Sequence, residues 1–66
     1  MAGNKRGKLK EHLTGIHRNF DWITHHCIET LKIIGDQKPE LSQAIISLGE
    51  GVAALDELTK GLYDKI

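Results

Sequence analysis

The fold is decided by residues 9–34, which read LKEHLTGIHRNFDWITHHCIETLKII. Apolar or small side chains recur in this stretch at alternating steps of four and three residues: Leu9, Leu13, Ile16, Phe20, Ile23, Cys27, Thr30 and Ile34. Alternation of four and three is a heptad repeat, which places all of these side chains on one stripe of an α-helix. A β-strand would need a period of two, which the stretch lacks. We therefore predict a helix over residues 8–34.

A second segment repeats the same steps at Leu41, Ile45, Leu48, Val52, Leu55, Thr59, Leu62 and Ile66. It predicts a helix over residues 39–65. Between the two helices, Gly35 suits the left-handed residue that follows a helix C-terminus, and Pro39 suits the first residue of a helix. A connection this short makes the helices antiparallel neighbours. The expected fold is an all-α antiparallel αα-hairpin over residues 8–66, preceded by a basic N-terminal arm at residues 1–7.

Composition indicates one small globular domain. The chain has 66 residues with nine basic and nine acidic side chains, and 39% of it is apolar. It contains no apolar run of the roughly 18 residues that a membrane span needs, and no secretory signal is expected. A single cysteine cannot form an internal disulfide, which favours the reducing cytoplasm. A core this small rarely supplies more than about 3–5 kcal/mol of stability.

Apolar residues outside the two heptad series favour self-association, because an exposed apolar patch usually marks an interface. We expect a homo-oligomer, a dimer or larger, that forms a helical bundle. The residues expected at its interface are Phe20, Ile28, Leu31, Ile46, Gly49, Val52, Leu58 and Tyr63. Glycines inside a helix cost about 1 kcal/mol each relative to alanine, so Gly49 and Gly51 favour close approach of another helix. A monomer with ordinary surface apolar residues is the alternative.

The chain carries no recognisable catalytic motif, and we expect no enzyme activity and no cofactor. Four histidines lie in the first helix, but no two have the spacing of three or four residues that a helical metal pair needs, so no metal site is predicted. Cys27 belongs to the apolar series and is expected to be a small buried hydrophobe rather than a nucleophile.

Charge is distributed unevenly along the chain. Up to Ile34 there are six basic and three acidic residues, and from Gly35 onward three basic and six acidic ones. A solvated charged surface is one explanation, and attraction of a phosphate-bearing ligand is the other. Zero net charge argues against a dedicated nucleic-acid binder. The residues expected to bind such a ligand, with cations for phosphate and an indole for stacking, are Lys5, Arg6, Lys8, Lys10, His17, Arg18 and Trp22.

Residues 36–58 read DQKPELSQAIISLGEGVAALDEL. This segment resembles the second helix of the small phage helical-hairpin family that sponges cyclic nucleotide signals of bacterial anti-phage systems, the anti-CBASS and anti-Thoeris sponges. The positions that carry the resemblance are Ser42, Ala44, Leu48, Glu50, Gly51 and Leu55. The long preceding helix and the short polar turn with an aspartate are similar too. Val52 and Ala53 depart from the family, which carries bulky residues there.

The resemblance implies a non-enzymatic homo-oligomer that sequesters a cyclic nucleotide between protomers in the host cytoplasm. Two other functions stay open. One is a phage- or plasmid-type regulator that binds a host protein through its helical faces, and the other is a purely structural oligomerisation module.

Overall fold

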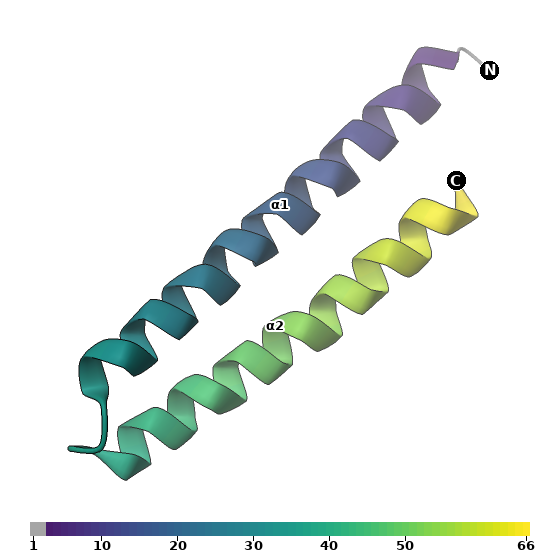
Figure 1. Cartoon of the computed structure of the whole chain (residues 1–66). Helices are drawn as coiled ribbons and strands as arrows, with labels where there is room; N and C mark the ends of the chain where they lie inside the picture. Colours follow the sequence, from purple (N-terminus) through teal and green to yellow (C-terminus); the bar gives the residue numbers. More distant parts are fainter. Residues whose placement is uncertain (1–2) are drawn as a thin grey trace.

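The computed structural model describes the backbone of residues 3–66 and the side chains from Lys5 onward. It contains two helices, α1 (Gly3–Ile34) and α2 (Pro39–Lys65). The helices run antiparallel side by side, so the start of α1 and the end of α2 lie at the same end of a rod (Figure 1). The rod measures 56 × 15 × 10 Å. The predicted all-α antiparallel hairpin is thus confirmed, and the described part of the chain contains no strand.

The turn between the helices forms as the sequence predicts. Gly35 adopts a φ of 58°, the left-handed conformation that glycine tolerates best. Its N–H donates to the carbonyl of Leu31 at 3.0 Å, and the N–H of Gln37 donates to the carbonyl of Ile34 at 3.3 Å. Pro39 is the first residue of α2, where its fixed φ suits the helix and its missing N–H costs no hydrogen bond.

Helix α1 begins at Gly3, earlier than the predicted start at residue 8. The described part of the predicted basic arm therefore continues the helix, with Lys5 and Arg6 exposed on it. Each residue added to an existing helix gains a hydrogen bond, and lysine and arginine are good helix formers, so extension is favourable without tertiary contacts. Residues 1–2 of the predicted arm lie outside the described residues.

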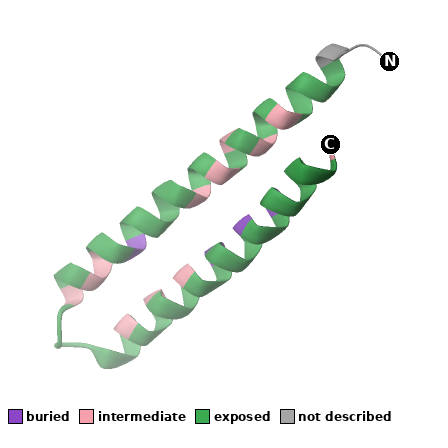
Figure 2. Ribbon diagram, turned by 45° about the vertical axis from the view of Figure 1, so that its right-hand side comes forward, coloured by how far each residue is buried: buried purple, intermediate pink, exposed green. Residues whose placement is uncertain are grey.

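The helices contact each other through two heptad rows apiece. The d row contains Leu13, Phe20, Cys27 and Ile34 of α1, with Ile45, Val52, Thr59 and Ile66 of α2; all eight side chains are buried or half-buried. The a row contains Lys10, His17, Thr24 and Leu31 of α1, with Ser42, Gly49, Asp56 and Tyr63 of α2. Six of these eight are buried or half-buried, the exceptions being Thr24 and Tyr63. The inner face of each helix is coloured pink and purple in Figure 2.

This arrangement shows that only half of the residues in each predicted heptad series face the other helix. The predicted series combined the d row with the g row, which contains Leu9, Ile16, Ile23 and Thr30 of α1, and Leu41, Leu48, Leu55 and Leu62 of α2. In the structure each helix is rotated so that the a row takes the inward place. The seven aliphatic side chains of the g row are left between 40% and 54% exposed. Cys27 is buried, as expected of a small hydrophobe on the inner face.

The residues predicted to bind another copy fall into two groups. Phe20, Leu31, Gly49 and Val52 are buried or half-buried between α1 and α2 of the same chain. Ile28, Ile46, Leu58 and Tyr63 are exposed. A Cβ atom at Gly49 or Gly51 would meet no neighbouring heavy atom within 4 Å, so the hairpin itself makes no use of the room these glycines leave.

We expect Phe20→Ala to lower the free energy of unfolding by roughly 2–3 kcal/mol, somewhat less than the about 3–5 kcal/mol typical of a fully buried phenylalanine, because Phe20 is half-buried between the helices. Glu57→Ala is the control, since this exposed carboxylate makes only a 3.7 Å contact with Lys60. It should change stability by no more than about 0.5 kcal/mol. Urea unfolding followed by circular dichroism measures both, and equal effects would contradict the placement of the d row between the two helices.

Candidate functional site

A histidine joins the two helices near the middle of the rod. Nδ1 of His17 lies 2.8 Å from both Oδ1 and Oδ2 of Asp56. Because a carboxylate only accepts hydrogen bonds, Nδ1 carries the hydrogen and donates it. Asp56 is one of four buried side chains in the described part of the chain, the others being Cys27, Val52 and Thr59. The contact therefore ties α1 to α2 through a polar pair at the centre of the hairpin.

The other ring nitrogen of His17 faces a second carboxylate. Its Nε2 lies 3.5 Å from Oδ2 of Asp21, one helical turn further along α1. The Asp21 side chain is 68% exposed against 13% for Asp56. Solvent screens the Asp21 contact and leaves it worth little, whereas burial makes the Asp56 contact the stronger of the two.

One ligand atom each from His17, Asp21 and Asp56 lies within 4.8 Å of the others, a spacing at which three side chains could share a divalent cation. Imidazole nitrogen and carboxylate oxygen are ligands that Zn²⁺ accepts. Each ring nitrogen already faces a carboxylate, however, so an ion would have to replace one of these contacts. The sequence prediction interpreted the His17–Asp21 spacing as an ordinary surface pair rather than as part of a metal site. Asp21, four residues after His17, was the signal in the sequence, but Asp56 becomes a neighbour only through the fold.

An outer pocket lies on the side of α1 that faces away from the g row. Arg18, Asp21, Trp22 and His25 line it. Trp22 is 60% exposed, and its ring centroid lies 5.8 Å from that of His25 and 5.9 Å from that of His26, nearly parallel to the latter. An exposed indole beside a guanidinium can stack on a flat ring and bind an anion. The Asp21 carboxylate adds an acceptor for an amino group.

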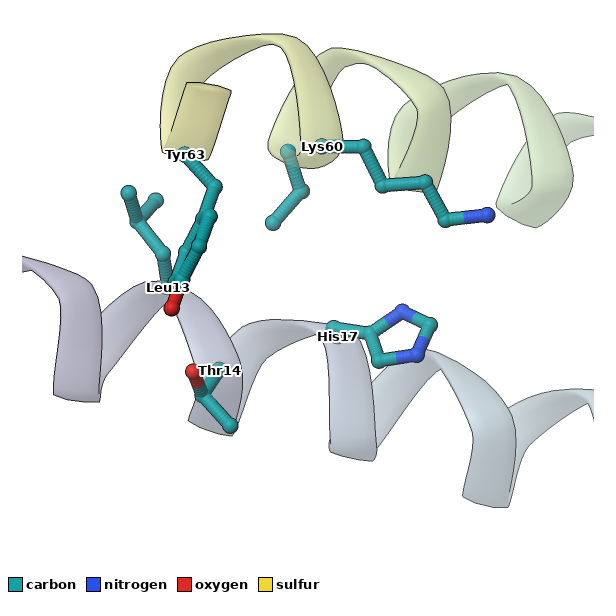
Figure 3. A pocket seen from close by; sticks show the side chains of 6 residues that line it. Leu13, Thr14, His17, Lys60 and Tyr63 are labelled. Atoms are coloured by element: carbon teal, nitrogen blue, oxygen red, sulfur yellow. The ribbon is translucent and has the colours of Figure 1, made fainter. Parts of the chain in front are cut away.

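An inter-helix pocket lies beside the His17–Asp56 pair. It is lined by Leu13, Thr14 and His17 of α1 and by Thr59, Lys60 and Tyr63 of α2 (Figure 3). The Tyr63 ring reaches from α2 toward Leu13 on α1, as Figure 3 shows. The ammonium of Lys10 lies 4.9 Å from the centroid of the same ring, a cation–π contact. His17 thus belongs to this pocket and contacts Asp21 of the outer one.

The structure brings together only part of the predicted ligand-binding set. Arg18 and Trp22 line the outer pocket, and His17 lines the neighbouring inter-helix pocket. Lys10 packs over Tyr63. The remaining three are exposed on the first turns of α1 and line neither pocket: Lys5, Arg6 and Lys8. Asp21, His25 and Lys60 were not predicted. Asp21, His25 and Lys60 are recognised as pocket-lining residues only from the folded structure.

Comparison with known proteins gave no match to a protein-family model, to a curated protein or to a solved structure. Within residues 3–66, neither helix is long and apolar enough to cross a membrane.

The His17–Asp56 pair can be tested by removing each carboxylate in turn. We expect Asp56→Ala to lower the free energy of unfolding by about 1–3 kcal/mol, because it leaves a half-buried imidazole N–H without its acceptor. Asp21→Ala removes the exposed contact to the same ring and should cost no more than about 0.5 kcal/mol. Asp56→Asn, which retains one acceptor oxygen, should recover part of the loss. Urea unfolding at one protein concentration compares the three, and equal losses for Asp56→Ala and Asp21→Ala would refute the assignment.

Proposed function

We propose that the protein is a non-enzymatic, homo-oligomeric binding protein that sequesters a phosphorylated small molecule bearing a flat aromatic ring. The observation that carries the proposal is the outer pocket, where Arg18 and the exposed face of Trp22 lie together. A guanidinium binds phosphate oxygens in a forked geometry, and an indole stacks on a nucleobase. A cyclic nucleotide, the ligand class that the sequence resemblance implies, has both of these parts.

The charges around the outer pocket suit a small ligand better than a long polyanion. Arg18 supplies one permanent positive charge, and Lys60 lines the neighbouring pocket. Asp21 in the same wall repels dense negative charge but accepts a hydrogen bond from an exocyclic amine of a base. One or two phosphates beside a base fit this balance, and a nucleic-acid backbone fits it poorly. The proposed setting is the cytoplasm of the host cell.

The second candidate is a regulator that binds a host protein through its helical faces. The most exposed aliphatic side chains in the described part of the chain favour it, since Ile33 is 86% exposed and Leu58 67% exposed. Single exposed apolar residues are common on protein surfaces, however, and these two stand on different helices without a pocket between them. The small-molecule proposal therefore takes precedence.

The ligand proposal is tested by thermal unfolding in the presence of a panel of cyclic mono- and dinucleotides, followed by calorimetric titration of any that raises the melting temperature. Arg18→Ala and Trp22→Ala should each weaken binding at least tenfold, because a charge-assisted hydrogen bond is worth about 1.5–3 kcal/mol where shielded from water and stacking of a base on an aromatic side chain about 1–3 kcal/mol. Lys32→Ala is the matched control, since Lys32 lies on the same helix and already pairs with Glu29 at 2.9 Å.

A chain lacking residues 1–7 tests the predicted role of Lys5 and Arg6 separately. If the basic segment takes part in binding, this chain keeps its helical content and loses at least tenfold in affinity. If no nucleotide in the panel shifts the melting temperature, the small-molecule proposal fails and the host-protein candidate replaces it.

A further inference from the structure

We propose that a second copy of this chain covers the g row, so that two hairpins pack face to face as a four-helix bundle. The proposal rests on the self-association in the proposed function and assigns it to a surface. That surface consists of Leu9, Ile16, Ile23, Leu41, Leu48, Leu55 and Leu62. It differs from the expected interface, because none of its residues was in that set.

The g rows of both helices lie on the same side of the hairpin. In an antiparallel pair, equal heptad positions flank the contact on the same side, and the inter-helix pocket shows this directly. Thr14 and Lys60 each follow a d-row residue, and they line one pocket from opposite helices. The His17–Asp56 and Lys10–Tyr63 contacts set the register. The g-row residues that this register places level are Leu9 with Leu62, Ile16 with Leu55, and Ile23 with Leu48.

The result is an aliphatic surface that runs along both helices. Its seven large side chains are between 40% and 54% exposed, whereas the inward a row carries a lysine, a histidine, a serine, a glycine and an aspartate. A chain that places polar residues inside and leucines outside has an apolar face that needs a partner. The hydroxyl of Ser42 in the a row has no hydrogen-bond partner among the described residues, a further sign that the inner face is not an efficient core.

The exposed area matches what a dimer requires. The chain exposes 5349 Å². A compact monomer of 7.4 kDa would expose about 4,200 Å² by the usual scaling with mass. The difference of roughly 1,100 Å² is comparable to the about 800 Å² that each partner buries in a standard stable interface. Covering the g row with an equal surface would bring the exposed area per chain close to that of a compact protein.

Charge favours another copy of the same chain over a different protein. The g row contains no charged residue, and the row beside it on α2 holds Ala44, Gly51 and Leu58 before it ends at Lys65. Beside it on α1 lie His12, Asn19, His26 and Ile33, with Lys5 at the start of the row. The exposed acidic residues of α2 lie on the other sides of the helix, at Glu40, Glu50, Glu57 and Asp64, and Asp56 is buried against α1. Two identical faces therefore meet without like-charge repulsion, and the open space at Gly51 leaves room for a close helix approach.

The test compares two matched pairs of substitutions on α2. Leu48→Glu with Leu55→Glu places two charges on the g row. Ile46→Glu with Ala53→Glu places the same charges at the same spacing on the opposite flank, where both residues are exposed. Sedimentation equilibrium at about 10–100 μM should show a dimer or a multiple of it for the wild type and the control, and a monomer for the g-row variant.

A folding-neutral variant accompanies the charged one, because a protein that depends on its dimer can unfold when the dimer is lost. Leu48→Ala with Leu55→Ala keeps a high helix propensity and should raise the dimer dissociation constant at least tenfold. A helical wild-type monomer at these concentrations overturns the proposal together with self-association. If the control variant dissociates while the g-row variants stay dimeric, the g row is not the interface, although the protein still self-associates. Neither result depends on the ligand test at Arg18.

Discussion

Two helices can bury only the strip along which they touch, and every other feature of this protein follows from that limit. In the described part of the chain just four side chains are buried, Cys27, Val52, Asp56 and Thr59, and two of them are polar. Within residues 3–66 no further helix or sheet packs against the two helices. Most of the many aliphatic residues are therefore exposed. The molecule is consequently a thin rod on which most aliphatic side chains stay at the surface.

The His17–Asp56 pair specifies which strip is buried. The d row faces the other helix whether its second row is the a row or the g row, so a small rotation of each helix exchanges the two alternatives. A buried hydrogen-bonded pair contributes modestly to stability but strongly penalises arrangements that leave either partner unsatisfied. The His17–Asp56 pair is compatible only with the a row turned inward. This rotation turns Leu48 and its g-row neighbours outward.

The sequence was sufficient to predict the two helices, the turn at Gly35 and the antiparallel hairpin, because heptad spacing and turn chemistry are local signals. It was insufficient to predict the helix rotation. The g row is the more apolar of the two candidate rows, and the His17–Asp56 contact that accompanies the inward a row joins residues far apart in the sequence. Of the four residues that line the outer pocket, two could be predicted from the sequence and two could not. Arg18 and Trp22 stood out by residue type, whereas Asp21 and His25 gained meaning from their position on one side of a helix.

The two proposals place assembly and ligand binding on different flanks of the rod. The g row lies on one flank, and the outer pocket with Arg18 and Trp22 lies on α1 away from it. In a bundle formed through the g row, the two outer pockets remain open on the surface of the dimer, and neither is completed by the second hairpin. A ligand held between protomers, as the sequence resemblance implies, must then connect one dimer to another through these pockets. Ligand-dependent growth from dimers to larger assemblies is therefore the behaviour that would unite both proposals, since a cyclic nucleotide with two phosphates and two bases can present one Arg18–Trp22 recognition surface to each of two dimers.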